Sequence, residues 1–461
     1  MSNNKFKTAV ASALALVFMP TQAQTQTVDG SWNGKLDIGT AKLNVVFNFC
    51  KGDDGKTLCT LDSPNQGAKG IPATVEYISE DSVAVAVPTI MAKYNGRVRE
   101  GKIDGTFAQA GMSLKLVLSP GFVEIKRPQT PKPPFPYITE EVTFSNAKDG
   151  TVLSGTLSLP QMMSISKRVP VVLMVTGSGQ QNRDEELLGH KPFLVIADFL
   201  ARHGIATLRY DDRGVGKSTG NASDVTMTSN MLDAIEGIDF LRKDNRFSKV
   251  GMLGHSEGGT IAFLSASKYA DKLDFIVSMA GTGVRGDSII VYQNRVMLES
   301  SGAPQTDIDN YCRLLGKVLD YRIGHARASV DGVAIVDSLA KSEKVSLPAP
   351  ALQNLAEVLT SPSPWMDQFL SFDPQKDISN VKCPVMAING SLDKQVDPSM
   401  NLGAIKRLLP KNDENLIKEY PSLNHLFQHC SKGYVAEYAT IEETISEDVM
   451  ADIAEWIKGL K

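Results

Sequence analysis

The sequence is poor in the residues that bind metals, and the few it has are not grouped as a metal site requires. Its 461 residues include five cysteines and six histidines. No two cysteines form a C-x-x-C pair, and no His/Cys cluster has the spacing of zinc ligands. We therefore expect no metal centre, and no motif in the chain indicates a cofactor.

The sequence also lacks a basic block and, beyond its start, any long apolar run. The formal net charge is −4, and the sequence has no cluster of basic residues that would predict binding to nucleic acid. No apolar run after the first residues reaches the length of a membrane-spanning helix. The composition, 42% hydrophobic and 22% charged, is that of a globular protein.

The first 23 residues have the order of a secretory signal. Lys5 and Lys7 precede the apolar stretch Ala9–Met19, and Pro20-Thr21-Gln22-Ala23 supplies small residues before a cut after Ala23. The alternative is a buried N-terminal helix. We predict a signal peptide at 1–23 and a periplasmic or secreted protein.

An exported protein allows disulfides, and one pair of cysteines is placed for a bridge. Cys50 and Cys59 flank a turn-rich segment between two strand-like runs, so a disulfide closing this hairpin is a candidate. Cys312, Cys383 and Cys430 lie far apart in the sequence. Cys383 stands at the start of an apolar strand pattern, which predicts a buried thiol.

The length predicts two domains, and a proline-rich segment separates them. Residues 24–126 carry short apolar runs between Gly, Asp and Pro, which predicts an all-β domain. We interpret it as a scaffold or dimerisation element that forms a homo-oligomer, with a binding module for glycans or a partner as the alternative. Residues 127–136 contain five prolines and predict a stiff connector.

Residues 137–461 alternate strand and helix patterns, which predicts an α/β fold with a mostly parallel sheet covered on both faces. An antiparallel start is expected at 141–144 and 153–157. The pattern breaks at 286–373, where helical spacing predicts a cap. The remaining expected strands are 169–175, 205–210, 249–253, 275–279, 385–388 and 416–420, and the expected helices are 191–203, 228–242, 259–269, 400–409 and 445–457.

The stretch Gly254-His255-Ser256-Glu257-Gly258 reads G-x-S-x-G between a strand pattern and a helix pattern. In that context the serine sits on a tight turn with its hydroxyl exposed, and the glycines avoid collisions with neighbouring backbone. The structural alternative is a glycine-rich turn that only packs tightly. We predict that Ser256 is a nucleophile.

A nucleophilic serine needs a histidine base and a carboxylate that orients it. Among the six histidines, His425 follows the last predicted strand and is our candidate, with His429 as runner-up. Asp393 follows the strand before it and is the candidate acid, whereas Asp397 precedes Pro398 and suits a helix cap.

The oxyanion of an acyl-transfer intermediate needs two N–H donors. One candidate is the backbone N–H of Glu257, directly after the nucleophile. The other lies in the glycine turn after the first parallel strand, at Ser178, with Gly179 as the alternative.

These segments resemble the alpha/beta-hydrolase superfamily, and within it the secreted bacterial carboxylesterases of the EstD type. The resemblance spans about Tyr137 to Lys461 and implies an alpha/beta-hydrolase fold and ester hydrolysis through an acyl-enzyme. Many relatives carry His-Gly where this chain has Thr176-Gly177. The residues that carry it are Thr176–Gly179, Tyr210–Ser218, Gly254–Gly258, Asn389–Asp393 and Asn424-His425.

Three other patterns receive structural interpretations. Asp211–Ser218 ends in Gly-Lys-Ser but lacks the first glycine of a phosphate loop, and its Arg213 is expected to tie loops together. Gly281–Gly286 fits G-x-G-x-x-G without a clear βαβ helix. The charged cluster Arg183–Glu186 is expected to be a solvated face, with substrate contact as the alternative.

The sequence thus predicts an exported serine hydrolase that acts on carboxylic esters of small to medium acyl groups. Its only expected partner besides a copy of itself is a small-molecule ester. An amidase or peptidase on the same residues is the alternative, because sequence separates the two activities poorly.

Overall fold

A computed structural model describes residues 28–38, 42–66, 68–122, 126–161, 168–325 and 331–461. The predicted signal peptide at 1–23 lies outside these residues. Within them, Val45–Asp62 and Gly70–Phe122 belong to one compact unit, and the residues after 125 belong to a second. No helix in the described ranges combines the length and apolarity needed to cross a membrane.

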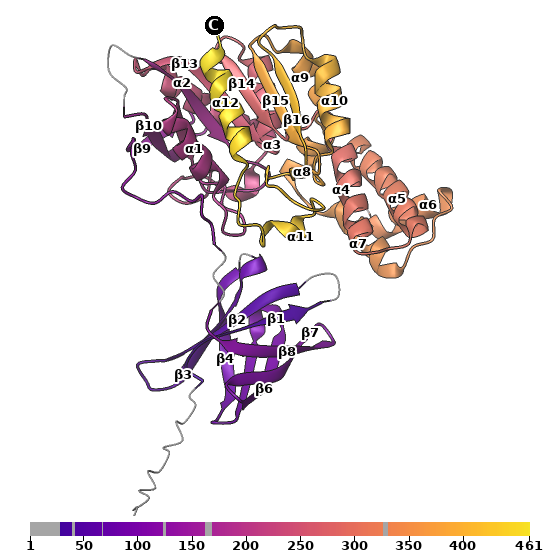
Figure 1. The fold of residues 1–461 in the computed structure, drawn as a ribbon. Helices are drawn as coiled ribbons and strands as arrows, with labels where there is room; N and C mark the ends of the chain where they lie inside the picture. Colours follow the sequence, from indigo (N-terminus) through magenta and orange to yellow (C-terminus); the bar gives the residue numbers. More distant parts are fainter. Residues whose placement is uncertain (1–27, 39–41, 67, 123–125, 162–167, 326–330) are drawn as a thin grey trace, which may run out of the picture. The chain divides into compact units, whose positions relative to one another are not determined.

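The first unit is a closed antiparallel barrel whose strands pair in chain order (Figure 1). Strand β1 closes on β8 through the pair Trp32 and Pro120, so neither of these strands is left as a free edge. The alternation predicted for Ser82–Val87 places Val83, Val85 and Val87 inside, each at most 2% exposed. The strands are β1 (Gly30–Asp37), β2 (Lys42–Lys51), β3 (Thr57–Ser63), β4 (Ala68–Ile78), β5 (Ser82–Val87), β6 (Ala92–Arg99), β7 (Lys102–Gln109) and β8 (Met112–Pro120).

The candidate disulfide between Cys50 and Cys59 is wrong, since both cysteines are free. Strands β2 and β3 pair with Phe49 opposite Cys59 and with Cys50 opposite Leu58. Because side chains alternate between the two faces of a strand, this one-residue offset buries Cys59 and leaves Cys50 exposed on the other face. The two thiols therefore face opposite sides of the barrel wall.

The second unit is built on an eight-stranded sheet with the order β16-β15-β14-β13-β11-β12-β10-β9. As predicted, it begins antiparallel, because β10 pairs antiparallel with both β9 and β12, and the strands from β12 to β16 pair in parallel. The strands are β9 (Ile138–Ser145), β10 (Val152–Leu159), β11 (Val169–Val175), β12 (Ala206–Tyr210), β13 (Phe247–His255), β14 (Phe275–Met279), β15 (Val385–Gly390) and β16 (Leu416–Tyr420).

Helices cover both faces of this sheet, which makes the central strands apolar on both sides (Figure 1). In β11, Leu173 and Val175 join the core beneath helices α2 and α3, while Val172 and Met174 join the core beneath α1 and α12. The helices are α1 (Pro192–Arg202), α2 (Met227–Arg242), α3 (Glu257–Lys268), α9 (Pro374–Asn380), α10 (Pro398–Leu408), α11 (Val435–Tyr438) and α12 (Glu447–Gly459).

The segment predicted as a cap is helical, and its helices pack around an apolar core of their own. Leu314, Val318, Val336 and Leu355 are completely buried in that core. The cap helices therefore bury apolar side chains against one another and form a packed subdomain. Its helices are α4 (Gly286–Ser300), α5 (Gln305–Gly324), α6 (Gly332–Ser342), α7 (Ala349–Thr360) and α8 (Pro364–Ser371).

The G-x-G-x-x-G pattern opens the cap and serves packing. A Cβ on Gly281 would lie 2.2 Å from the hydroxyl of Ser278, and one on Gly283 would lie 2.4 Å from the carbonyl oxygen of Asn401. The Gly283 N–H also donates to the Asn401 side chain at 2.9 Å. These glycines let the chain pass close to β14 and α10.

The first residues of the predicted connector are bonded to the second unit. Arg127 donates from its guanidinium to the carbonyl oxygens of Leu188, Ala439 and Ile441 at 2.8–2.9 Å. The Gln129 amide donates to the Ile445 carbonyl at 2.7 Å. Arg127 and Gln129 are thus part of the second unit and do not act as a free spacer.

Arg213 ties loops together as expected, through a buried ion pair with Asp233 of α2. The guanidinium donates twice to this carboxylate at 2.6 and 2.7 Å, and the two side chains are 8% and 3% exposed. Asn146 donates to the same carboxylate at 2.6 Å. The pair joins the loop after β12 to α2 and to the end of β9.

We expect Arg213→Ala to lower the free energy of unfolding by about 3–5 kcal/mol, because it leaves the Asp233 charge buried without its partner. The matched control is Arg202→Ala, which breaks the more exposed pair with Asp198 on α1 and should cost less than about 1 kcal/mol. Urea unfolding at neutral pH measures both. Equal losses in the two variants would contradict this assignment.

Candidate active site

Ser256 lies on a strained turn between β13 and α3. Its backbone angles are φ 55° and ψ −115°, a conformation that residues other than glycine rarely adopt and that costs about 1–3 kcal/mol. A Cβ on Gly254 would lie 1.9 Å from the Gly258 carbonyl oxygen, and one on Gly258 would lie 2.0 Å from that of Val175. Only glycine fits at either position, so the predicted turn has the geometry that its sequence pattern requires.

His425 and Asp393 form a direct hydrogen bond, with 2.7 Å between His425 Nδ1 and Asp393 Oδ2. The two residues are 4% and 1% exposed. The other carboxylate oxygen of Asp393 accepts from the backbone N–H groups of Gln395 and Val396 at 2.8 and 2.9 Å. A carboxylate held in this way keeps the proton of His425 on Nδ1 and leaves Nε2 free to act as a base.

The parallel sheet brings the serine and histidine segments to the same edge. Ser256 follows β13, Asp393 follows β15, and His425 lies in the loop after β16. The carboxyl ends of parallel strands share one edge of a sheet. His255, directly before Ser256, has its ring centroid 4.8 Å from that of His425.

The two alternative residues weighed from the sequence have other partners. The His429 side chain is 60% exposed and pairs with Glu443 at 2.9 Å. Asp397 caps α10 by accepting from the Met400 N–H at 2.7 Å. His429 is therefore not the partner of Asp393, and Asp397 is not the partner of His425.

The two candidate oxyanion donors lie on the turn of Ser256 and on the loop that packs against this turn. Glu257 is the first residue of α3, so its N–H has no partner within the helix. On the loop after β11, a Cβ on Gly177 would lie 3.3 Å from Ser256 Cβ, which places this loop against the turn. The Gly177 N–H already donates to Glu185 at 2.8 Å. The next candidate donor along the loop is therefore the backbone N–H of Ser178.

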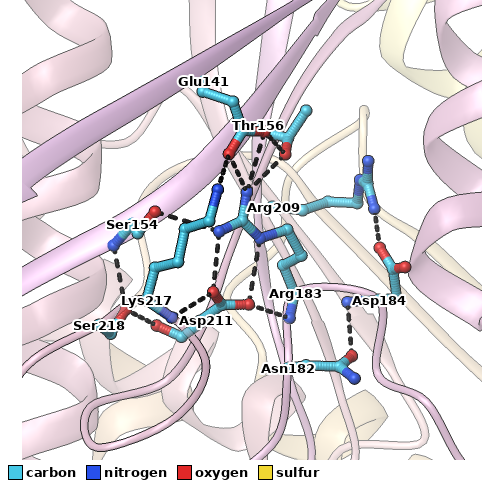
Figure 2. Close-up of polar contacts among 10 residues, drawn as sticks. All are labelled: Glu141, Ser154, Thr156, Asn182, Arg183, Asp184, Arg209, Asp211, Lys217 and Ser218. Carbon is cyan, nitrogen blue, oxygen red and sulfur yellow. Dashed lines mark hydrogen bonds and ion pairs between the residues drawn. The ribbon is translucent and has the colours of Figure 1, made fainter.

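The loop that carries Ser178 is held by a network of charged side chains (Figure 2). The prediction that Arg183–Glu186 form a solvated face is wrong for Arg183 and Asp184, which are partly buried, and for Glu185, which is buried, whereas Glu186 is exposed. Arg183 bonds the carboxylate of Asp211 through its guanidinium at 2.8 and 3.1 Å and through its backbone N–H at 3.0 Å. Its other nitrogen donates to Thr156 and Glu141, and Asp184 pairs with Arg209. Sequence reasoning missed this because the partners come from strands far away in the chain.

Asp212, next to this network, anchors both ends of the same loop. Its Oδ2 accepts from the Thr176 hydroxyl at 2.8 Å and from the Gln181 N–H at 2.9 Å. Burial, together with the charges of Glu185 and Glu257, raises the pKa of Asp212 to about 7 against the lowering effect of its hydrogen bonds. The motif Asp211–Ser218 is therefore structural, as expected.

The cap reaches the Ser256 turn through Trp365 of α8. The Trp365 indole N–H donates to Glu257 Oε2 at 2.7 Å. Burial raises the pKa of Glu257, while hydrogen bonds from Trp365, Ser178 and Asn230 oppose the rise. On α4, the Tyr292 hydroxyl lies 3.4 Å from the Asp393 carbonyl oxygen. The cap thus contacts Glu257, the residue after Ser256, and Asp393.

A mostly parallel sheet, a strained serine turn and a His–Asp pair at its carboxyl edge define an alpha/beta-hydrolase. Residues 149–402, more than half of the chain, match the family model described as X-Pro dipeptidyl-peptidase (S15 family). The chain belongs to this family, and it is a hydrolase.

A curated relative and solved structures are also similar to this chain. Esterase EstD of Thermotoga maritima is 22% identical over 360 residues, which cover 78% of this chain and 74% of the relative. Est1E from Butyrivibrio proteoclasticus, solved with ferulic acid, is 16% identical, with 68% of this chain and 96% of that chain covered and a TM-score of 0.40. The Pyrococcus furiosus esterase Pf2001 is 16% identical, with 73% and 98% covered and a TM-score of 0.43.

We expect Asp212→Asn to remove a pH dependence of stability. The unfolded chain ionises this group near pH 4 and the folded chain near pH 7. Stability from the neutral buried carboxyl is therefore complete below pH 4 and is lost as the pH rises to 7, at about 1.4 kcal/mol per pKa unit. Urea unfolding of both proteins from pH 4 to 8 measures the difference. A wild-type-minus-variant difference that stays constant over this range would contradict the assignment.

Proposed function

We propose that this protein is an exported serine carboxylesterase that cleaves esters of small to medium acyl groups through an acyl-enzyme. The observation that carries the proposal is the 2.7 Å bond between His425 and Asp393 beside the strained Ser256 turn. Export rests on the order of basic, apolar and small residues in the first 23 positions. The barrel is proposed to join copies of the chain.

In the proposed reaction the Ser256 hydroxyl attacks the ester carbonyl carbon and passes its proton to His425 Nε2. Asp393 stabilises the imidazolium that forms, and the N–H groups of Ser178 and Glu257 stabilise the oxyanion. His425 then gives the proton to the leaving alkoxide, which departs as an alcohol. Water, activated by His425, attacks the acyl-enzyme, and the acid is released with Ser256 restored.

Peptide hydrolysis is the second candidate, because the matched family is described as an X-Pro dipeptidyl-peptidase. A peptidase that removes two residues from a free N-terminus needs an accessible acidic group for the substrate ammonium. Glu257, the carboxylate next to the nucleophile, is 3% exposed and already accepts from Trp365. A carboxylate that is closed off from solvent is a poor site for a substrate ammonium, and this favours the ester over the peptide.

Ser256→Ala is expected to abolish hydrolysis of p-nitrophenyl acetate, because no other group in the proposed mechanism forms the acyl-enzyme. Wild-type protein should be labelled at Ser256 by a fluorophosphonate, and the variant should not be labelled. The matched control is Ser300→Ala, which changes an exposed serine on α4 and should retain full turnover. Retained ester turnover in Ser256→Ala would disprove the role of Ser256.

A set of three substrates separates the two candidate functions. We expect kcat/KM for p-nitrophenyl acetate to exceed those for p-nitroacetanilide and Gly-Pro-p-nitroanilide by at least about 100-fold, or about 2.7 kcal/mol in transition-state free energy. Steady-state kinetics at one pH measure all three. Faster cleavage of the Gly-Pro substrate would overturn the esterase proposal in favour of the peptidase.

A further inference from the structure

We propose that Glu185 and His255 are a positioning pair for the catalytic histidine loop, with His255 held as an imidazolium cation. The inference rests on the proposed function, in which His425 is the base. His255 and Glu185 form a second histidine–carboxylate pair, in addition to His425 and Asp393. Neither Glu185 nor His255 contacts the substrate in this proposal.

Both ring nitrogens of His255 face oxygen acceptors. Nδ1 lies 2.9 Å from Glu185 Oε1, and Nε2 lies 2.9 Å from the backbone carbonyl oxygen of His425. A neutral imidazole carries one N–H, whereas the cation carries two. Both contacts are hydrogen bonds donated by His255 only when the ring is protonated on both nitrogens.

The same carboxylate oxygen also holds the oxyanion loop. Glu185 Oε1 accepts from the Gly177 N–H at 2.8 Å as well as from His255. One oxygen therefore links the residue before Ser178 to the residue before Ser256. Through His255, the link continues to the carbonyl of His425, so three segments far apart in the sequence are held together.

The charges around His255 favour the cation. The groups that face it are Glu185 on the loop after β11 and, on the loops after β15 and β16, Asp393 and His425. Burial alone lowers the pKa of His255, but the charge and hydrogen bond of Glu185, the His425 carbonyl and the charge of Asp393 outweigh burial and raise it.

Two further carboxyl groups lie nearby: Asp212, whose electrostatic surroundings include Glu185, and Glu257, which interacts electrostatically with Asp212. The pKa of each is raised, with burial as the largest cause. Both groups therefore tend toward the neutral form, which limits the negative charge that the pocket must bury. The cation on His255 offsets the charge of Glu185.

Loss of the His255 proton breaks one of these bonds. A neutral ring with its proton on Nδ1 keeps the bond to Glu185 but turns a lone pair toward the His425 carbonyl oxygen. A ring with its proton on Nε2 turns a lone pair toward Glu185 Oε1. In either case one link is lost, so that either the backbone of His425 or the side chain of Glu185 is no longer tied to His255. The wild-type kcat should therefore fall on the alkaline side.

Glu185→Gln tests this pair with little change of shape. Because the Gly177 N–H and His255 Nδ1 share one oxygen, a Gln oxygen there keeps the proton of a neutral His255 on Nδ1 and removes the bond to His425. We expect kcat for p-nitrophenyl acetate at neutral pH to fall about tenfold, the size of one lost hydrogen bond. KM should change by less than about twofold, since ground-state binding is untouched.

The pH profile is the decisive readout. In Glu185→Gln the alkaline limb of kcat should move to lower pH by about one unit or more, because the charge that favours the imidazolium is gone. In His255→Phe the alkaline limb should be absent and kcat low throughout. The matched control is His429→Phe, which removes the exposed histidine paired with Glu443 and should leave the profile unchanged. Alkaline limbs of wild type and Glu185→Gln that coincide would overturn the proposal.

A second measurement does not depend on turnover. In full-length protein labelled with ¹⁵N-histidine, with His255→Phe used for assignment, we expect both His255 nitrogens to carry protons at pH 7.5. A His255 ring with one unprotonated nitrogen would overturn the proposal even if kinetics were ambiguous. Failure of the function itself is distinct, since wild type would then lack both ester turnover and fluorophosphonate labelling at Ser256.

Discussion

The close approach of three backbone segments around the Ser256 turn is the constraint on which the rest of the hydrolase unit depends. Gly258 lies so near the Val175 carbonyl of β11 that any Cβ would collide with it, and Gly254 lies equally near Gly258. The turn, the start of α3 and the end of β11 are therefore locked together. This contact brings the loop after β11 against Ser256, and the strain stored at Ser256 is offset by the packing of the sheet around it.

Paired charged side chains that hold the loop after β11 are the second important feature of this site. The loop after β11 is held from one side by Arg183, Asp211 and their partners (Figure 2) and from the other by Asp212 and Glu185. Ionic groups cost free energy to bury unless they are paired. Their concentration on one loop is expected where backbone N–H groups must hold a fixed position for charge that develops in a reaction.

Much of the fold could be predicted from sequence because its signals are local. The predicted strand at 169–175 matches β11 residue for residue, and the predicted terminal helix overlaps α12, whose buried positions recur with helical spacing. Closure of the barrel was not predicted, since the pairing of β1 with β8 joins segments at opposite ends of that domain. The disulfide prediction failed for a related reason, because a one-residue register offset between β2 and β3 is invisible in the sequence.

For the site, the sequence by itself determined which residue types occupy the strand ends: a serine between glycines, an aspartate after β15 and a histidine after β16. Chain order and periodicity were enough for this, because parallel strands expose their carboxyl ends at one edge. Only the tertiary structure decided which histidine meets Asp393, that Glu185 is buried and Arg183 partly buried, and that His255 bridges Glu185 to the His425 loop. Those contacts join residues separated by tens to hundreds of positions. Their energies depend on burial and mutual orientation, which local sequence patterns do not encode.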